Sequence, residues 1–471
     1  MAHLGILSEQ DIVSIHQAAL RILAEVGIIL THPIVRELLS SHGARANGNR
    51  VLIPADLVTR CLAQCPRTVK VQGRDSAQAI VLGDGILHTH NVGGVPNIAD
   101  ANTGARRPAV REDNVNTAHL LDALPNVSSL TPFFTPQDVP AAAMALWMYY
   151  DTVANTTKPV HGPGAQTARE VQALAEMARI ACPEGNVTVG ISPVSPLFFP
   201  DDVADAILEV ARQGLPLGPL PCPILGATAP MSIAGALAQQ SAEVLACVVL
   251  AQLIRPGLPI FYCGRLSVMH PRTGLSVWGN PEIGLISAAT VEVAHHYGLP
   301  VNVYGLCTDS HTSDVQCGYE RAINALIPAL AGADEISGVG EMGGGVLGSL
   351  AQMVIDDEIL DSVKRTLRGF EVNPDSLAID VIAKVMDGSR NFLSQKHTVK
   401  YMRQGEVLLT RLAGREGWAE WEASGRRGIV ERASERATEL IAHHEAPPLD
   451  LRQLAEMEKV IRTVEQEIGQ Q

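Results

Sequence analysis

The stretch VNVYGLCTDSHTSDVQCGYER, from Val301 to Arg321, contains one complete passage from a strand to a helix. It begins as an apolar strand and ends as the start of a helix, and four polar residues, Thr308 to His311, lie between the two. In a parallel barrel, polar groups at the carboxyl ends of strands point into a shared mouth where chemistry takes place. We therefore expect this polar corner to lie at a functional site.

The same passage from strand to helix recurs along the chain. Strand-like runs cover residues 85–94, 126–134, 158–164, 186–196, 216–226, 259–268, 300–307 and 334–342. Helices are expected after them at about 111–124, 141–154, 166–181, 201–214, 232–254, 280–298, 313–330 and 349–368. This alternation predicts a parallel sheet, and eight units predict an α/β fold of the closed (β/α)8 TIM barrel type. The prolines in 216–226 predict an irregular fifth strand.

The flanking segments do not fit the barrel count, so the sequence predicts three parts. Residues 1–80 are expected to form an N-terminal helical extension packed on the barrel, with a first helix capped by Ser8 and stopped at Gly27. Residues 81–370 form the predicted catalytic barrel. Residues 371–471 are helical and more charged, and are predicted to form a C-terminal helical extension.

The composition excludes several classes of protein. The chain of 471 residues has a formal net charge of −14 and lacks a long Lys/Arg run, so a nucleic-acid partner is not expected. The spacing of its eight cysteines matches neither a zinc knuckle nor a disulfide framework, which favours a reducing compartment. The longest apolar run, 244–254, is too short to span a bilayer. Together with an N-terminus unlike a signal peptide, this predicts a soluble cytoplasmic protein without membrane contact.

The helix after the polar corner carries its own start signal. Ser313 and Gln316 have the spacing of a capping box, which would make both residues structural. The apolar residues that follow at helical spacing are expected to be buried: Val315, Tyr319, Ile323, Leu326 and Leu330.

The remaining strand ends supply further polar and aromatic candidates. They are His88, His90, Asn91, Phe133, Phe134, Gln137, His161, Ser192, Ser195, Thr228, Arg265, Ser267 and Glu341. For each residue alone, a loop side chain satisfied by backbone is the simpler interpretation. As a set gathered by a barrel, they predict at least one functional cluster.

The His88-x-His90 motif leaves a second function open. An HxH motif at the end of the first barrel strand ligates zinc in metal-dependent amidohydrolases, and His161 could add a third ligand. The fifth, sixth and eighth runs, however, offer Thr228 and Arg265 in place of histidines and Glu341 in place of an aspartate. A metal-dependent barrel hydrolase therefore remains an alternative, and a bound metal is not expected.

Ten blocks of sequence, in this order, resemble the trimethylamine methyltransferase family. They are LSEQDIVSIHQAALRILAEVG, GARRPAVREDNVNTAHLLDALPNV, TPQDVP, KPVHGPG, PVSPL, GATAPMSIAGALAQQSAEVLA, PEIGLISAA, TDSHTSDVQCGYE, FLSQKHTVKYMR and WEASGRRGIVERASERA, which together extend from Leu7 to about His443. The resemblance implies a TIM barrel that transfers a methyl group from an amine nitrogen to the Co(I) centre of a separate corrinoid protein. It implies a methylated amine and a cognate corrinoid protein as partners, with no tightly bound cofactor, and we also expect a homo-oligomer.

Two departures from the family pattern bear on the substrate. The chain lacks the pyrrolysine of the trimethylamine enzymes proper, and in this it resembles the glycine betaine branch, which acts on quaternary amines. A lysine is common in the family where this chain has His311, and smaller residues are common where it has Phe133 and Phe134. A quaternary ammonium loses a neutral tertiary amine, so its demethylation needs binding and positioning more than a proton donor. A non-catalytic quaternary-amine binding protein remains a third alternative.

Chemistry and strand-end position together assign the expected roles. The trimethylammonium group needs a ring face or a carboxylate, and a substrate carboxylate needs a cation or a helix N-terminus. The predicted catalytic residues are Asp309, His311 and Glu341. The predicted substrate-binding residues are His90, Asn91, Phe133, Phe134, Gln137, His161, Ser195, Arg265 and Tyr304.

Overall fold

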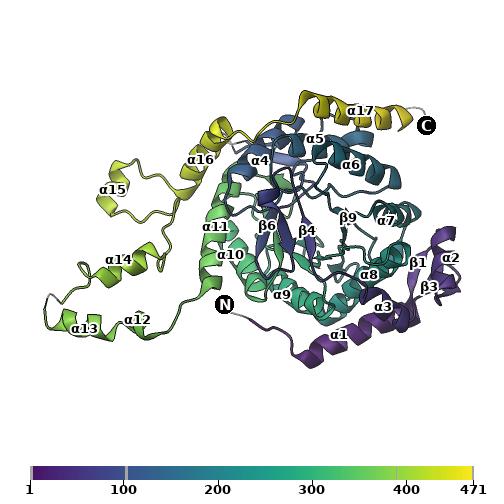
Figure 1. Cartoon of the computed structure of the whole chain (residues 1–471), viewed down its shortest axis with the longest axis horizontal. Helices are drawn as coiled ribbons and strands as arrows, with labels where there is room; N and C mark the ends of the chain where they lie inside the picture. The colour runs from purple at the N-terminus through teal and green to yellow at the C-terminus, as the bar shows by residue number, and fades with distance from the viewer. Residues whose placement is uncertain (1–3, 101–103, 389, 469–471) are drawn as a thin grey trace.

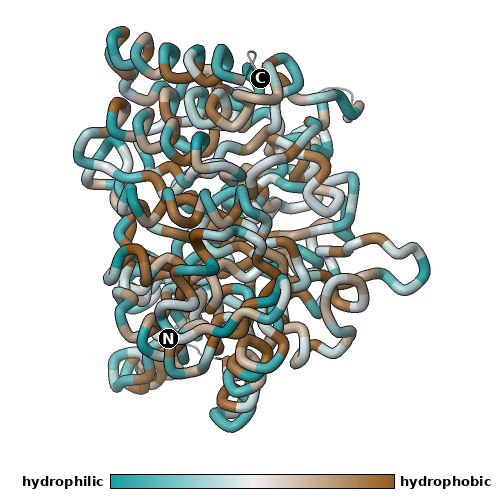
Figure 2. Tube along the Cα trace, turned by 90° about the vertical axis from the view of Figure 1, so that its right-hand side faces the viewer, coloured by the Kyte–Doolittle hydropathy of each residue, from teal (hydrophilic) through white to brown (hydrophobic). Residues whose placement is uncertain are grey.

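The structure is a computed structural model, and it describes residues 4–100, 104–388 and 390–468. The fold is α/β, with short strands in the centre and a surrounding ring of helices (Figure 1). Hydrophobic stretches of the chain run through the middle of the molecule, while many outer turns are hydrophilic (Figure 2). This arrangement confirms the α/β part of the predicted fold class.

Parallel strands occupy the centre. They are β6 (His88–Asn91), β9 (Val189–Ile191), β11 (Leu217–Pro219), β13 (Tyr262–Gly264), β16 (Val301–Tyr304) and β17 (Glu335–Val339). The parallel pairs are β9 with β11, β13 with β16, β16 with β17 and β17 with β6. A parallel bridge from Leu217 to Ile260 continues the pairing from β11 to the segment that contains β13.

The second and third predicted strands, 126–134 and 158–164, are present only as isolated parallel bridges. Leu130 pairs with Val160, and His161 pairs with Thr188 next to β9. The expectation of two full strands was therefore wrong. The runs contain Pro132 and Pro159, which lack the N–H group that a regular ladder requires. The runs still follow the predicted path, since Ser128 N donates to Thr89 O at 2.8 Å.

All eight helices predicted for the barrel are present. They are α4 (Arg111–Ala123), α5 (Met144–Ala154), α6 (Ala168–Ala181), α7 (Asp201–Gln213), α8 (Ile233–Ile254), α9 (Pro281–His296), α10 (Val315–Leu330) and α11 (Leu350–Arg368). The predicted starts at Ser232, Asn280 and Ser349 are confirmed as N-caps. α8 is the one helix in the described ranges that is long and apolar enough to cross a membrane, and most of it is buried inside the protein.

The prediction for the start and the buried face of α10 was wrong. Asp314 caps the helix by accepting from Cys317 N, and Val315, Tyr319 and Ile323 are 86%, 54% and 39% exposed. The inner face is polar instead. Arg321 is fully buried there and forms an ion pair with Asp356 of α11 at 2.8 Å. A buried charge that has a partner can take the inner face that an apolar pattern predicts for hydrophobic residues.

Short strands lie in the loops that follow the central strands. They are β7 (Asn97–Ala99), β8 (Arg106–Pro108), β10 (Phe198–Phe199), β12 (Ile224–Leu225), β14 (Ser267–Met269), β15 (Ser276–Val277), β18 (Glu341–Met342) and β19 (Leu347–Gly348). β18, β19, β7 and β8 form one sheet, and β12, β14 and β15 form another. Two 3-10 turns are η2 (Ser76–Gln78) and η3 (Ala141–Ala143).

The N-terminal extension contains strands as well as helices. Its elements are α1 (Glu9–Arg21), the π-helix η1 (Ile22–Val26), β1 (Ile28–Leu30), α2 (Pro33–Ser41), β2 (Arg45–Asn47), β3 (Arg50–Leu52), α3 (Ala55–Leu62), β4 (Val69–Val71) and β5 (Ile80–Leu82). The Ser8 cap is confirmed by its hydrogen bond with Asp11 N, and Gly27 ends the helical segment at φ 76°. β1 pairs with β10 of the barrel region, so a sheet joins the extension to the rest of the fold.

The C-terminal extension divides into a part that packs on the ring of helices and a part that projects from it. Its helices are α12 (Pro374–Leu377), α13 (Ile379–Met386), α14 (Lys396–Arg403), α15 (Trp418–Ala423), α16 (Ile429–His443) and α17 (Leu451–Ile468). α16 lies beside α11, and α17 lies across α5 and α6, whereas α12 to α15 project away from the ring (Figure 1).

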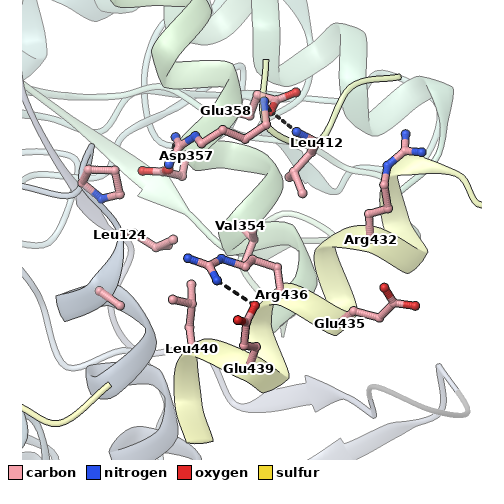
Figure 3. A pocket seen from close by; sticks show the side chains of 13 residues that line it. Leu124, Val354, Asp357, Glu358, Leu412, Arg432, Glu435, Arg436, Glu439 and Leu440 are labelled. Carbon is pink, nitrogen blue, oxygen red and sulfur yellow. Dashed lines mark hydrogen bonds and ion pairs between the residues drawn. The ribbon is translucent and has the colours of Figure 1, made fainter. Parts of the chain in front are cut away.

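A cavity of about 460 Å³ lies where α16 meets α11 and the end of α4 (Figure 3). Charged side chains in its lining form ion pairs: Arg436 pairs with Glu439, and Arg411 pairs with Asp357. Glu358 accepts from the backbone of the segment that contains Arg411. We therefore interpret this cavity as part of the interface between the C-terminal extension and the barrel region.

Candidate active site

A second cavity, of about 490 Å³, lies among the ends of the central strands. Each of the eight strand-like runs contributes to its lining, through His90, Thr131, His161, Gly190, Cys222, Arg265, Tyr304 and Ser337 among others. Strands distant in sequence thus meet around one hollow, as expected for the mouth of a parallel barrel. We take this cavity as the candidate active site.

A buried carboxylate next to the cavity organises its polar side chains. Glu335, at the start of β17, is 0% exposed and accepts from Ser129 Oγ at 2.9 Å, His161 Nε2 at 3.0 Å and Asn302 Nδ2 at 2.6 Å. Burial alone would raise the pKa of Glu335, but its electrostatic interactions with His161 and His90 and its hydrogen bonds from His161 and Asn302 lower it below its usual range. The cavity therefore has a fixed negative charge behind its wall.

His90 is held as a neutral imidazole. Its Nε2 accepts from Asn302 Nδ2 at 2.7 Å, which leaves Nδ1 to donate to Thr131 Oγ1 at 3.1 Å. Burial lowers the pKa of His90 to about 3, despite the opposing charge of Glu335. At neutral pH His90 is therefore a neutral hydrogen-bonding ring and does not act as a general acid.

Arg265 is the buried cation of the cavity. Its guanidinium lies 4.7 Å from the centre of the Tyr304 ring, and its Nη1 donates to Gly264 O and Asn302 O at 2.8 and 3.2 Å. Its Nη2 donates to Asn302 Oδ1. Nε has no acceptor among the described residues, so Arg265 retains donor capacity for a ligand in the cavity. Asn302 therefore links this cation to Glu335.

One group of side chains has the composition of a metal site. His90, His161 and Glu335 each offer a donor atom, and these atoms lie within 4.8 Å of one another. The donor atoms already form hydrogen bonds with each other and with Ser129 and Asn302. The guanidinium of Arg265 nearby also opposes a divalent cation. The arrangement is a satisfied polar network, and we do not infer a metal from it.

His88 does not belong to this group, so the HxH pair does not act as one site here. Its Nε2 lies 3.5 Å from Oδ1 of Asp84, a residue that precedes β6 in the chain. Residues two apart on a strand are separated by about 6–7 Å, so His88 and His90 lie in different layers.

Four of the predicted site residues line the cavity: His90, His161, Arg265 and Tyr304. Asn91 and the two phenylalanines lie outside the lining. The side chain of Asn91 bonds the backbone of Thr131, since its Nδ2 donates to Thr131 O at 2.6 Å and its Oδ1 accepts from Thr131 N at 3.0 Å, and so it joins β6 to the second run. Phe133 and Phe134 are buried as an edge-to-face pair 4.6 Å apart.

Gln137 and Ser195 also lie outside the lining. Gln137 is exposed, and its Nε2 donates to Thr135 O at 2.9 Å. Ser195 Oγ donates to Glu243 Oε2 at 2.8 Å, and the same carboxylate accepts from Leu197 N. Ser195 thus contributes to the turn after β9.

The three residues predicted to be catalytic lie behind or beside the lining. Asp309 accepts from the backbone N–H groups of Trp278 and Gly279 at 2.8–3.1 Å. Glu341 is buried and accepts from Thr308 N at 3.0 Å, while His311 is exposed. The polar corner is therefore used mainly to fix the loops around the cavity.

The sequence interpretation missed several residues that build this site. Trp278 and Phe261 line the cavity, and Ser129 and Glu335 anchor its polar network. A polar residue inside an apolar strand is the signal that could have indicated Glu335 and likewise Asn302. Such a side chain must point into the barrel and find a partner there.

Comparison with known proteins shows the family of this chain. Residues 1–469 match the family described as trimethylamine methyltransferase (MTTB). A trimethylamine methyltransferase, MttB, from Desulfitobacterium hafniense is 30% identical over 98% of this chain and 94% of its own. A glycine betaine methyltransferase from the same species is 29% identical over 99% and 98%.

Among solved structures, the monomethylamine methyltransferase MtmB of Methanosarcina barkeri is similar, with 13% identity, a TM-score of 0.49, and coverage of 92% of this chain and 93% of its own. The family match extends over nearly the whole chain. The chain belongs to the trimethylamine methyltransferase family.

Proposed function

We propose that this protein is a corrinoid-dependent methyltransferase that demethylates a quaternary amine carrying a carboxylate, such as glycine betaine. The observation that carries the proposal is Arg265, a buried guanidinium with unused donor capacity in a cavity shared by all eight strand-like runs. Family membership supports the reaction class. The sequence lacks pyrrolysine, which supports a quaternary amine as the substrate.

Arg265 suits a carboxylate better than an ammonium group. A buried guanidinium binds a carboxylate through charge-assisted hydrogen bonds, each about twice as strong as a neutral one. The guanidinium of Arg265 lies over the Tyr304 ring, and the centres of the Trp278 and Tyr304 rings are 4.7 Å apart. The Tyr304 ring is therefore not free for a second cation. The substrate ammonium is therefore assigned to Trp278 and Phe261 in the lining, with Glu335 supplying the negative potential.

The state of His90 fits a substrate that needs no proton. When a quaternary ammonium loses a methyl group, the leaving group is a neutral tertiary amine, and His90 is neutral at the working pH. The work of the site is then to bind and orient the substrate.

The rim of the cavity suits the approach of a large flat ring. When docked, the corrinoid of the partner protein supplies the Co(I) nucleophile that accepts the methyl group. Gly93, Gly94 and Gly164 are exposed lining residues, and a Cβ on Gly164 would meet nothing within 4 Å. Small residues keep this edge low, which supports a role in docking the partner.

We also propose that the protein is cytoplasmic and that its strand segments close into a (β/α)8 barrel. The closure is supported by a series of contacts around the centre. Ser128 N of the second run donates to Thr89 O of β6, and parallel bridges join Leu130 to Val160 and His161 to Thr188. The parallel pairs from β9 to β17 follow, and β17 pairs with β6 again.

The test is a methyl-transfer assay with cob(I)alamin and a panel of methylated amines. We expect loss of the Co(I) absorbance with glycine betaine and little change with tetramethylammonium, which lacks a carboxylate. Arg265→Met should reduce kcat/KM for glycine betaine by about 10–150-fold, since a hydrogen bond to a charged group is worth about 1.5–3 kcal/mol. The exposed Arg45→Met is the matched control.

Other outcomes would favour the alternatives. Betaine binding by calorimetry without any methyl transfer, tested also with corrinoid proteins, would indicate a binding protein. Equal rates with glycine betaine and tetramethylammonium would contradict the carboxylate assignment. Stoichiometric zinc or iron by elemental analysis would favour the hydrolase.

A further inference from the structure

The cavity of the candidate active site is larger than glycine betaine. Its volume is about 490 Å³. The eight non-hydrogen atoms of glycine betaine fill at most about 240 Å³, even at the volume of about 30 Å³ that a water molecule occupies in the liquid. About half of the cavity therefore has no assigned occupant.

The groups already assigned to the substrate come from one side of the barrel region. Phe261 and Arg265 belong to the sixth strand-like run, and Trp278 lies on the loop that leads to α9. The guanidinium of Arg265 and the centre of the Trp278 ring each lie 4.7 Å from the centre of the Tyr304 ring. A carboxylate on Arg265 and an ammonium group on Trp278 are therefore close together, as they are in an α-amino acid.

The opposite side of the cavity has an apolar lining. One face of η3 and α5 lies there, and α5 and α9 are on opposite sides of the ring of helices (Figure 1). We call this side the apolar branch, and its residues are Pro132, Ala141, Met144, Ala145, Met148 and Pro163. The four residues from η3 and α5 have the spacing of a single helix face, so this face is directed at the cavity.

The apolar branch follows directly on the polar network of the site. Asn302 bonds both Arg265 and His90. His90 Nδ1 in turn lies 3.1 Å from Thr131 Oγ1, and Pro132 is the next residue in the chain. The lining therefore changes from polar to apolar inside one cavity, and a molecule held by Arg265 can extend toward α5 without leaving it.

The composition of the branch favours an aliphatic group over a second charged one. Glu170 of α6 is the acidic residue among the described residues that line the cavity. Its Oε2 accepts from Gln166 N and Thr167 N at 2.8 and 3.0 Å, so this carboxylate is used to cap α6. Met144 and Met148 have flexible side chains, which adapt to apolar groups of different shapes.

We propose that the substrate is the betaine of an amino acid with an aliphatic side chain, such as trimethyl-leucine, and that this side chain occupies the apolar branch. The inference rests on the proposed function and names its substrate more closely. Arg265 binds the carboxylate, Trp278 and Phe261 contact the ammonium group, and the side chain on the α-carbon extends toward α5. The reaction is unchanged: nitrogen keeps the electron pair of the broken C–N bond, and the product is the dimethyl amino acid.

The experiment compares glycine betaine, trimethyl-leucine and γ-trimethylaminobutyrate in the methyl-transfer assay with cob(I)alamin. In the wild type, kcat/KM for trimethyl-leucine should exceed that for glycine betaine by at least about tenfold, because a single methylene in an apolar pocket is worth about 10–200-fold. Ala145→Phe fills the branch, so the ratio of these two kcat/KM values should fall to about one. Ala145→Val, a smaller change, should lower the ratio in the same direction.

The matched control is Ala142→Phe. Ala142 belongs to η3, is half-buried like Ala145 and lies outside the lining of the cavity. This variant should keep the wild-type ratio of kcat/KM values. Circular dichroism of all variants checks that the fold is retained.

Equal kcat/KM for glycine betaine and trimethyl-leucine in the wild type would overturn the inference and leave the proposed function intact. A preference for γ-trimethylaminobutyrate would also overturn it, since the extra carbons would then lie between the carboxylate and the ammonium group. An equal loss of activity with all three betaines in Ala145→Phe would contradict it too and would assign the branch to the corrinoid.

Calorimetry separates failure of the inference from failure of the proposed function. If none of the three betaines gives up a methyl group, the proposed function is wrong and binding decides the inference. Tighter binding of trimethyl-leucine than of glycine betaine, weakened by Ala145→Phe, would support the apolar branch as a side-chain site. Equal binding of the two betaines would overturn it.

Discussion

At the scale of single residues, the cavity is defined by how each buried polar group finds partners. Asn302 donates to both His90 and Glu335 and accepts from Arg265, so one amide connects a neutral ring, an anion and a cation. Each unsatisfied member of such a network would cost about 1–3 kcal/mol. The network therefore fixes Arg265 before any substrate arrives, and a fixed cation binds a carboxylate at lower entropic cost.

Glu341 gives a pH-dependent prediction at this scale. Burial raises its pKa to about 7, although Arg321 and the N–H of Thr308 lower it. The folded state then binds this proton more tightly than the unfolded state, so stability is lost as the pH rises through about 7. Glu341→Gln removes that loss. The difference in Tm between the variant and the wild type should therefore shift in favour of the variant between pH 5 and pH 8. The corresponding change in the free energy of unfolding is about 3 kcal/mol.

Thermal unfolding followed by fluorescence at both pH values checks this prediction. The exposed Glu420→Gln serves as the control, because an exposed carboxylate has no burial penalty to lose. A Tm difference that stays constant between the two pH values would show that Glu341 is ionised equally in both states.

At the scale of elements, loops and caps place the side chains around the cavity. Asp309, on the loop before α10, accepts from Trp278 N and Gly279 N and so holds the loop that carries the Trp278 ring. Asp314, five residues later, caps α10 itself. Two carboxylates close in sequence therefore have different roles, one toward the site and one toward the helix.

Substitution of these two aspartates should separate the roles. Asp309→Ala should raise KM for the amine about tenfold, because Trp278 loses its position, as a misplaced group costs up to about 100-fold. Asp314→Ala should lower stability by about 1 kcal/mol, the usual cost of a lost N-cap, and leave KM unchanged. Steady-state kinetics and thermal unfolding of both variants check this. Equal effects of the two changes on KM would contradict the assignment.

At the scale of the whole molecule, the two ends of the chain are joined to the barrel region to different degrees. α17 buries Met457, Ile461 and Val464 against the ring of helices, and Trp147 Nε1 donates to Glu465 Oε1 at 3.0 Å. The segment that carries α12 to α15, by contrast, projects away from the ring and is tied to α11 by Arg365, whose Nη2 donates to Glu406 O at 2.6 Å (Figure 1). α17 is thus packed on the ring of helices, while α12 to α15 stand apart from it.

Truncation of the chain tests this difference. A chain that ends at Pro447 loses α17 and exposes apolar surface, with each uncovered side chain worth about 1.5–3 kcal/mol. The sum approaches the total stability of a typical protein, so we expect aggregation or a much lower Tm. A chain that ends at Glu467 keeps the packing and should behave as the wild type. Soluble protein with an unchanged Tm after truncation at Pro447 would show that α17 is dispensable for folding.

The sequence by itself determined the helices of the barrel region, the α/β class and the family. The eight helices, and the starts of three of them at Ser232, Asn280 and Ser349, follow from local periodicity and start signals, which depend on near neighbours in the chain. Four of the predicted site residues, among them Arg265 and His161, follow from their place at strand ends.

Only the tertiary structure decided which of those residues face the cavity. Ser129 and Glu335 meet although they are 206 residues apart, and Trp278 joins the lining through its contact with Tyr304, and no local pattern records such contacts. The inverted faces of α10 have the same cause: Arg321 can be buried because Asp356 on another helix neutralises it. Partners that are distant in sequence decide whether a polar group faces the core, and for this reason the fold was predictable while most of the site was not.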